Sequence, residues 1–419
     1  MINMNKVIKE LPDMLSGNEL QKAMSIIPKY DKQIQEDGSM TERLLKLSDL
    51  YSIYIPSQMS TEIYSKLYLG IIRSMQKKEN KLAVQQFNST YRTMQNIKNK
   101  TGNQQYDGII GGSDSFTIIG ASGIGKSSAI SRALNLMEAN HVIEIEHPYT
   151  KILPCLTVQC PFDSSVKGLL LEILRKVDEQ LGTDYAQTRR FTTDMLIGAV
   201  SQVCLNHIGL LVVDEIQNVV NSKNGKNLIG SLTQLINNSG ISICMVGTPD
   251  SEIFFEQAMQ LARRSVGLKY TALPYDEHFC EVCECLFSYQ YVKNITYINS
   301  TTIEWLYQHS AGVISIVVSL IHDAQEIAIL NGREVLDIKS LDEAYNNRLS
   351  MLHDYIRPAM RKKSIGNNKI KKQNIITTLP IKNSADIQKD LIQNFAKECK
   401  KDGTDIVEIL SQYITVEVV

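Results

Sequence analysis

The chain has neither a charge excess nor a long apolar run, and its first residues do not have the pattern expected of a secretory leader. Its 44 lysines and arginines face 45 aspartates and glutamates, which gives a formal net charge of −1 over 419 residues. Without a global excess, no long-range field steers the protein to nucleic acid, so any polyanion contact needs a local patch. No apolar run approaches the roughly 20 residues of a membrane helix. Residues 1–20 are mixed and charged, unlike a signal peptide, so no membrane partner is expected.

Cysteine is also sparse, with eight residues scattered mostly through apolar segments. This usage predicts reduced, buried thiols in a cytoplasmic protein. His278, Cys280, Cys283 and Cys285 lie close enough in sequence to suggest zinc. However, the segment DEHFCEVCECLF has the pattern of one amphipathic helix, and one helix cannot direct four side chains at one ion. Structural thiols are the favoured interpretation, and a metal site is the alternative.

The middle of the chain alternates apolar β-branched runs with helical patterns. The runs predict strands at 116–119, 152–160, 208–213 and 241–246. The clearest helical pattern covers 164–181, where apolar residues share one face and Gly182 marks the end. Nearly continuous apolar strands separated by helices predict an α/β fold with a parallel sheet that is flanked by helices.

A glycine-rich loop follows the first of these strands, in the segment FTIIGASGIGKSS (116–128). It matches the phosphate-loop pattern G-x-x-x-x-G-K-[ST] between a strand and a helix. Glycines let backbone N–H groups surround phosphates, Lys126 neutralises the β and γ oxygens, and Ser127 is a ligand for Mg²⁺. The expected ATP-binding residues are Gly120, Ala121, Ser122, Gly123, Ile124, Gly125, Lys126, Ser127 and Ser128. A plain glycine turn is the alternative.

A second motif, IGLLVVDEIQ, is an apolar strand that ends in two carboxylates. A magnesium–nucleotide site needs a carboxylate at the end of a neighbouring strand, and Asp214 fits that role together with Ser127. Glu215 is then placed to polarise the attacking water. The two motifs together predict an ATPase that uses ATP and Mg²⁺, and the Asp-Glu pair favours the AAA+ branch.

Two further features agree with that branch. The strand SICMVGT ends in a polar residue, where AAA+ proteins place a sensor of the γ-phosphate, so Thr248 is predicted to act as that sensor. The next helical stretch ends in Arg263 and Arg264, and either could be an arginine finger at a neighbouring subunit. A solvated helix end is the alternative for both arginines.

At this point a family resemblance becomes specific. The segments GASGIGKSSAISRAL, LTVQCPFDSSVKGLLLEIL, LLVVDEIQNV, MVGTP, LARRSVGLKYTALPYDEHFCEV, YQYVKN and HSAGVISIVVSLI resemble TnsC, the AAA+ regulator of bacterial cut-and-paste and CRISPR-associated transposons. TnsC is related to TniB and to the IstB helper ATPases. The resemblance covers about residues 50–355.

The resemblance implies an organisation and a set of partners. The sequence pattern predicts a helical N-terminal arm (1–105) that packs on the core and a basic linker with a C-terminal partner-binding tail (356–419). The resemblance identifies the parts between them as an AAA+ α/β domain (106–272) and a small helical lid domain (273–355). It further implies a homo-oligomeric ring or filament around double-stranded DNA, with about six or seven subunits per turn. A TniQ/TnsD-type selector and the TnsB transposase, with or without TnsA, would be partners, in the nucleoid-associated bacterial cytoplasm.

DNA contact is expected on the helix 164–181 and the turn after it. In related proteins a lysine and a threonine of this region touch the DNA backbone. Lys167 matches the lysine, Thr183 or Thr188 is the expected threonine, and Arg175 and Lys176 are further candidates. Phosphate contacts of this kind position the protein without reading sequence. A solvated helix face is the alternative for each residue.

One position departs from the wider AAA+ pattern. The stretch AGVISIVVSL in the lid has Ser315 where many AAA+ proteins have an arginine. The lid then supplies no cation to the γ-phosphate, which predicts slow hydrolysis and a long-lived ATP state.

The alternative function is an AAA+ replication initiator or helicase loader, which would carry a C-terminal winged helix. The residues after the lid pattern are few and irregular for such a domain. A signalling NTPase without DNA is a third class, and it would carry repeat or effector domains. The basic stretch 357–373 is interpreted as a tether or DNA contact, with a plain linker as the alternative.

Overall fold

The computed structural model describes residues 4–76, 115–146, 149–162, 165–187, 192–219, 225–252 and 266–350. The chain divides into two compact units, 1–361 and 362–419. The second unit, the basic stretch 357–373, and the C-terminal tail lie outside the described residues, as do Arg263, Arg264 and Thr188.

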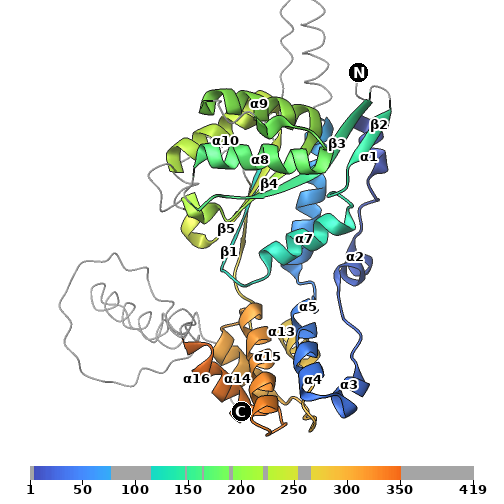
Figure 1. Cartoon of the computed structure of the whole chain (residues 1–419), viewed down its shortest axis with the longest axis vertical. Helices are drawn as coiled ribbons and strands as arrows, with labels where there is room; N and C mark the ends of the chain where they lie inside the picture. Colours follow the sequence, from blue (N-terminus) through green and yellow to red (C-terminus); the bar gives the residue numbers. More distant parts are fainter. Residues whose placement is uncertain are drawn as a thin grey trace, which may run out of the picture. The chain divides into compact units, whose positions relative to one another are not determined.

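A six-stranded sheet forms the centre of the first unit, in the order β2-β3-β4-β5-β1-β6 (Figure 1). The strands are β1 (Phe116–Gly120), β2 (Ile143–Glu146), β3 (Tyr149–Gln159), β4 (Ile208–Asp214), β5 (Ser242–Gly247) and β6 (Val266–Tyr270). All neighbours pair in parallel except β2 and β3, which pair antiparallel. The predicted parallel-dominated α/β fold is confirmed. The edge strands β2 and β6 were not predicted, because both are short and carry charged residues.

Each face of the sheet is covered by its own set of helices (Figure 1). Leu211 and Val213 of β4 pack in a core with α8 (Val166–Leu181), α9 (Thr193–His207) and α10 (Gly225–Ser239). Leu210 and Val212, which alternate with them, face a second core that includes α7 (Lys126–Leu136). Because both faces are buried, the strand is apolar at nearly every position.

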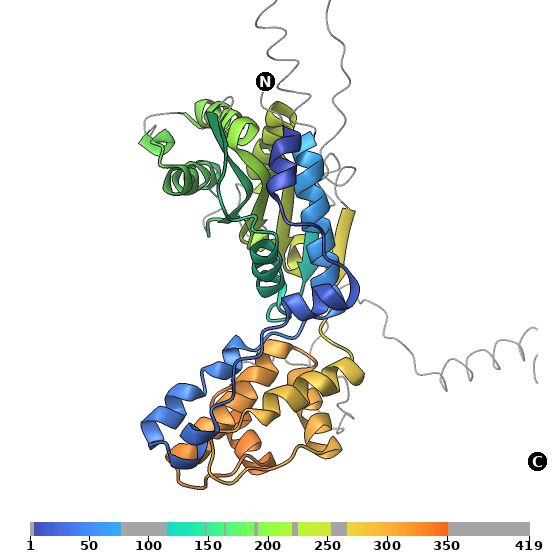
Figure 2. The ribbon, with the colours of Figure 1, turned by 90° about the vertical axis from the view of Figure 1, so that its right-hand side faces the viewer.

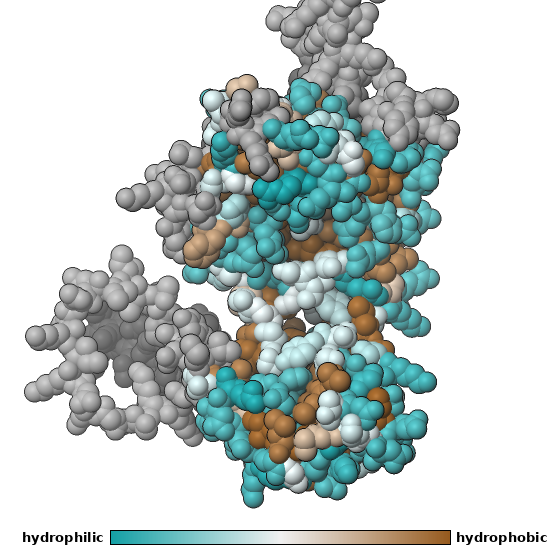
Figure 3. All heavy atoms as spheres, in the orientation of Figure 1, coloured by the Kyte–Doolittle hydropathy of each residue, from teal (hydrophilic) through white to brown (hydrophobic). Residues whose placement is uncertain are grey.

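The sequence of helix α8 accounts for its two ends and for its buried face. The Ser165 side chain accepts a hydrogen bond from the Gly168 amide at 3.1 Å and caps the first turn. Gly182 ends the helix in a left-handed conformation with φ of 69°. Its apolar stripe is buried, and Figure 3 shows mainly hydrophilic residues over the outer face of the helices on this side of the sheet.

Four helices after β6 form a separate helical core. They are α13 (Glu277–Ser288), α14 (Ser300–Ser310), α15 (Ile314–Leu330) and α16 (Ile338–Asn347). The cysteine-rich segment is the single helix α13 that its pattern predicts, and burial raises the pKa of the Cys283 thiol to about 12. No cysteine joins a possible metal cluster among the described residues. Cys283 is fully buried in the helical core, and Cys280 and Cys285 are partly buried against it.

No single helix in the described part of the chain is long and apolar enough to cross a membrane. Helices α14 and α15 together meet a length and hydropathy test for a span, but the chain bends by 118° between them. Buried residues of both helices belong to the helical core.

The N-terminal segment packs partly against the sheet and partly against helices α13 to α16 (Figure 2). Its helices are α1 (Met4–Glu10), α2 (Gly17–Met24), α3 (Lys32–Asp37), α4 (Met40–Lys46), α5 (Asp49–Ser52) and a helix over residues 58–76. Apolar residues of α1, α2 and 58–76 join the sheet core, whereas Leu47 and Leu50 join the helical core. The periodicity of this segment predicts helices but not this division.

A buried ion pair holds α4 against the helical core. The Arg43 guanidinium donates to both carboxylate oxygens of Glu334 at 2.6 Å and to the Tyr291 carbonyl at 2.9 Å. The side chains are only 3% and 16% exposed. Hydrogen bonds from Arg43 also lower the pKa of Glu334. Such a pair is costly to break, since the surviving charge stays buried without its partner.

Substitution Arg43→Met is therefore expected to lower the free energy of unfolding by about 3–5 kcal/mol. Urea unfolding followed by the fluorescence of the single tryptophan, Trp305 in α14, measures the loss. The control Arg333→Met removes a half-exposed ion pair with Asp337 and should cost no more than about 1 kcal/mol. Equal losses in the two variants would contradict the assigned role of Arg43.

Candidate nucleotide-binding site

The glycine-rich loop has the backbone of a phosphate cradle. It joins the end of β1 at Gly120 to the start of α7 at Lys126. Gly123 and Gly125 have φ of 80° and 95°, a conformation that side-chain-bearing residues rarely adopt. The N-terminus of α7 therefore faces the loop with free N–H groups and a positive dipole end, which suits an anion.

The polar side chains of the loop meet the end of β4. The Lys126 ammonium donates to the carbonyls of Gly120 and Ala121 at 2.7 and 2.8 Å. The Ser127 hydroxyl donates to a carboxylate oxygen of Asp214 at 2.9 Å. Burial lowers the pKa of Lys126, and the carboxylates of Asp214 and Glu215 oppose that shift. The structure thus brings together the Ser127 and Asp214 side chains that were predicted to hold Mg²⁺.

Glu215 sits at a bend directly after β4. It has a positive φ of 58°, and its amide donates to the other carboxylate oxygen of Asp214 at 2.8 Å. A left-handed backbone is unusual at a glutamate and is typical of a residue held for function. The Glu215 side chain is exposed at the cavity and accepts a hydrogen bond from the amide of Gln217.

Thr248 follows β5 and begins the short helix η3 (Pro249–Ser251). Its amide donates to the Gln217 side-chain oxygen at 3.3 Å. Its hydroxyl is buried and has no hydrogen-bond partner among the described residues. The hydroxyls of Thr157 and Ser242 are also buried without a described partner, but Thr248 is the one of the three that lines a cavity, where a phosphate oxygen could accept its hydrogen bond.

A cavity of about 220 Å³ brings these groups together. It is lined by residues of the glycine-rich loop and by Asp214, Glu215, Gln217, Thr248 and Ser315. Loop amides and Lys126 fit the phosphates of ATP, Ser127 and Asp214 fit Mg²⁺, and Thr248 offers an unused hydroxyl. The residues present therefore fit both groups. Gln217 was not predicted from the sequence, because a glutamine after an apolar residue does not by itself indicate a functional role.

A larger cavity of about 810 Å³ adjoins the loop at Gly123 and Gly125. Residues 50–62 of the N-terminal segment, the chain after β6 and the start of α15 line it. It has the size and mixed apolar lining of a small-molecule site. This makes it the expected place for the nucleoside part of a nucleotide that is bound at the loop.

Helix α15 touches the glycine-rich loop at Ser315. The Ser315 amide donates to the Gly123 carbonyl at 3.2 Å, and Ser315 lines both cavities. A Cβ atom at Gly123 would collide with the Ser315 hydroxyl. The lid position that was predicted to lack a cation therefore lies against the phosphate loop.

The four described candidates for DNA contact differ in their surroundings. Lys167 is exposed near the start of α8 and has no hydrogen bond or ion pair with any described residue. Arg175 pairs with Glu172 at 2.8 Å, and Lys176 donates to the Thr157 carbonyl at 2.9 Å. The Thr183 hydroxyl donates to Asp178 at 2.7 Å. Lys167 is thus the candidate with a free ammonium.

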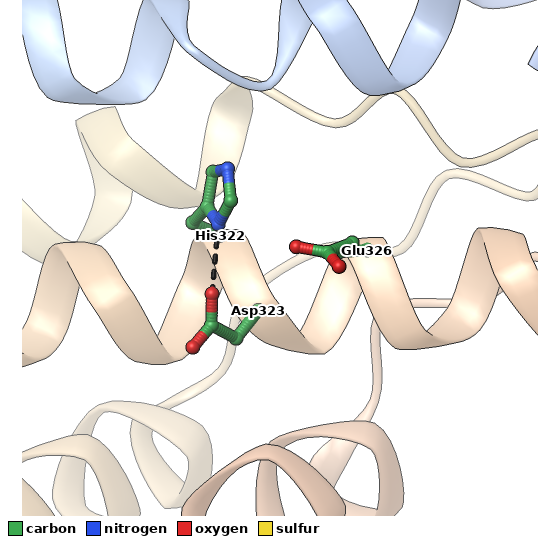
Figure 4. Close-up of side chains that lie close together, drawn as sticks. All are labelled: His322, Asp323 and Glu326. Carbon is green, nitrogen blue, oxygen red and sulfur yellow. Dashed lines mark hydrogen bonds and ion pairs between the residues drawn. The ribbon is translucent and has the colours of Figure 1, made fainter. Parts of the chain in front are cut away.

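Figure 4 shows a separate group of ionisable side chains on α15, His322, Asp323 and Glu326. Their possible ligand atoms lie within 4.8 Å of one another. However, His322 pairs with Asp323 at 2.8 Å, and Glu326 accepts from Arg348 at 3.0 Å. The group behaves as a charged helix face, and we assign it no ligand.

Comparisons with known proteins agree with the nucleotide-binding fold. Residues 110–253 match the family model of an AAA domain. Among solved structures, the chain is similar to the Orc1 protein of Aeropyrum pernix in complex with DNA, with 17% identity and a TM-score of 0.43 over 58% of this chain and 61% of that one. It is also similar to Cdc6p of Pyrobaculum aerophilum, with 10% identity and a TM-score of 0.41 over 55% of this chain and 59% of that one. No curated protein matches the chain in sequence.

The AAA-domain match and the sheet place the central part of this chain in the AAA+ P-loop NTPase fold. The chain spans about three fifths of the length of the two solved structures. The match to the AAA-domain family model supports nucleotide binding by the phosphate loop.

Substitution Lys126→Ala should lower the affinity for a non-hydrolysable ATP analogue by about 10- to 100-fold, because a charged hydrogen-bond donor to phosphate is lost. Titration calorimetry with Mg²⁺ present measures the change. Lys151→Ala is the control, because Lys151 pairs with Glu144 at the sheet edge and lies outside both cavities. An unchanged dissociation constant for Lys126→Ala would contradict the assigned cradle.

Proposed function

We propose that this protein is a slow Mg²⁺-dependent ATPase whose ATP-bound form assembles on duplex DNA, and that it regulates DNA transposition in the manner of TnsC. The observation that carries the proposal is the meeting of the phosphate loop, Asp214, Glu215 and the unpartnered Thr248 hydroxyl around one cavity. These groups come from three strands that are far apart in the sequence. Their convergence supports nucleotide hydrolysis over a purely structural loop.

Each residue of the cavity has a distinct task in this proposal. The loop amides and Lys126 bind the phosphates, and Ser127 and Asp214 hold the metal. Mg²⁺, when bound, would neutralise charge that develops on the phosphate oxygens. Glu215 orients and deprotonates the attacking water, and Thr248 holds an oxygen of the terminal phosphate or that water.

Ser315 supports slow turnover. The lid reaches the loop through a backbone amide and a hydroxyl, so it offers no cation to the terminal phosphate. Of the described residues that line the smaller cavity, Lys126 alone is cationic, and it faces the carboxylates of Asp214 and Glu215. We propose that Arg263 or Arg264 of a neighbouring subunit adds the missing positive charge, which makes hydrolysis depend on assembly.

The proposed DNA contact rests on α8. The Lys167 ammonium has no partner among the described residues, whereas the other described candidates already use their polar groups within the fold. With a net charge of −1, a DNA-bound assembly would depend on few contacts per subunit repeated around a ring. TniQ/TnsD-type and TnsB partners belong to the proposal through the sequence resemblance. A replication initiator or helicase loader would share the same nucleotide site.

The decisive experiment observes assembly and partners together. Glu215→Gln should bind ATP and duplex DNA as ordered oligomers seen by electron microscopy, while hydrolysis falls at least about 100-fold. Wild-type protein with ATP should retain a TniQ- or TnsB-like protein on duplex DNA in a reconstituted pull-down. Retention of a replicative helicase instead would assign the initiator or loader function, and absence of DNA binding in every nucleotide state would contradict both functions.

Substitution Lys167→Ala should weaken duplex binding equally for unrelated sequences and lower the slope of log affinity against log salt by about one per subunit. Fluorescence anisotropy over a salt series with the ATP analogue measures both quantities. Arg175→Ala is the matched control on the same helix, because Arg175 is already paired with Glu172. An unchanged affinity and salt slope for Lys167→Ala would remove Lys167 from the DNA interface.

A further inference from the structure

The Gln217 side chain lies between the Glu215 carboxylate and the Thr248 amide at the smaller cavity. It lies in the short helix η2 (Ile216–Val219), directly after the bend at Glu215. Its side-chain amide donates to the Glu215 carboxylate, and its side-chain oxygen accepts from the Thr248 amide at 3.3 Å. The same side chain also lines the cavity.

The neighbours of Gln217 permit one orientation of its side chain. If the amide were flipped, its oxygen would face the Glu215 carboxylate and its NH₂ group would face the Thr248 N–H. Both contacts would then repel, because a carboxylate only accepts hydrogen bonds and a backbone N–H only donates them. The two hydrogen bonds therefore form together.

The surrounding backbone holds Gln217 in place. Ile216 is fully buried in the core under α8 to α10, which anchors η2 beside the sheet. Gly247 lies against the Ile216 side chain and the Gln217 oxygen, where a Cβ atom would collide with Ile216. Gln217 is thus set by packing on one side and by two polar partners on the other.

Glu215 needs such a restraint more than most glutamates. Its left-handed backbone is an unfavourable conformation for a residue with a side chain, and its carboxylate is exposed at the cavity. Among the described residues, Gln217 supplies the side-chain hydrogen bond to the Glu215 carboxylate, and Lys126 acts on that carboxylate through charge. The backbone groups of Glu215 contact Asp214 and Asn218. The direction of the carboxylate therefore depends on Gln217.

We propose that Gln217 is a positioning residue that fixes the Glu215 carboxylate relative to Thr248. This inference rests on the proposed ATPase function, because Glu215 must be the group that acts on water. Gln217 does not react. It links the residue that contacts the terminal phosphate to the residue that activates water, so that both adopt their geometry as one unit. A partner of this kind typically contributes about 10- to 100-fold to the activity of the group that it orients.

The experiment measures kcat and ATP affinity for two variants of Gln217. Gln217→Met keeps the side-chain length without either hydrogen bond, and Gln217→Leu removes both hydrogen bonds with a shorter, branched and equally uncharged side chain. Both should lower kcat of the DNA-bound protein by about 10- to 100-fold and leave the dissociation constant of the ATP analogue within about twofold. Gln308→Met is the control, because Gln308 donates to Glu304 on α14 away from the cavity, at 3.1 Å, and it should leave both quantities unchanged.

A double-mutant cycle separates positioning from a general structural effect. In the Glu215→Gln background, Gln217→Met should cause no further loss of the residual rate, because Gln217 acts through Glu215. A full additional loss in that background, or unchanged kcat in both single variants, would overturn the inference. If Glu215→Gln itself kept the wild-type kcat, the proposed ATPase mechanism would fail first, and the two failures are therefore distinguishable.

Discussion

The parallel pairing of β4, β5 and β1 is the constraint on which the nucleotide site depends. Val213 of β4 pairs with Met245 of β5, and Gly247 of β5 pairs with Ile119 of β1. Parallel neighbours end at the same edge of a sheet, so their following residues must meet there. That rule places the phosphate loop, Asp214 and Thr248 around one cavity.

The parallel pairing also explains which strands and site residues could be predicted from the sequence. Burial on both faces made the central strands continuous apolar runs, so their positions and the parallel sheet were predictable. The motif residues could be placed because each follows such a strand directly. The edge strands β2 and β6 were missed, because β2 alternates isoleucine with glutamate and β6 is a short run that includes Gly267 and Lys269. The residues outside the described ranges, including Arg263 and Arg264, stay predictions.

The features that the sequence did not predict all arise from tertiary contacts. Helical periodicity cannot tell which of two cores a helix joins, so the division of the N-terminal segment between the sheet and α13 to α16 was not predictable. The buried pair of Arg43 and Glu334 also joins residues far apart in the chain. Gln217 is a similar case, because its importance arises from Thr248 on another strand and not from its own surroundings in the sequence.

The charges that line the smaller cavity bear on the proposed slow hydrolysis of ATP. The described lining contains one cation, Lys126, and two carboxylates, Asp214 and Glu215. A triphosphate adds several negative charges, so one magnesium ion and one lysine leave the terminal phosphate incompletely neutralised. Among the described residues, the lid reaches Gly123 through the neutral Ser315 and adds no cation to the cavity lining. Under the proposed function, a cation from another subunit would complete this neutralisation, so hydrolysis would depend on assembly.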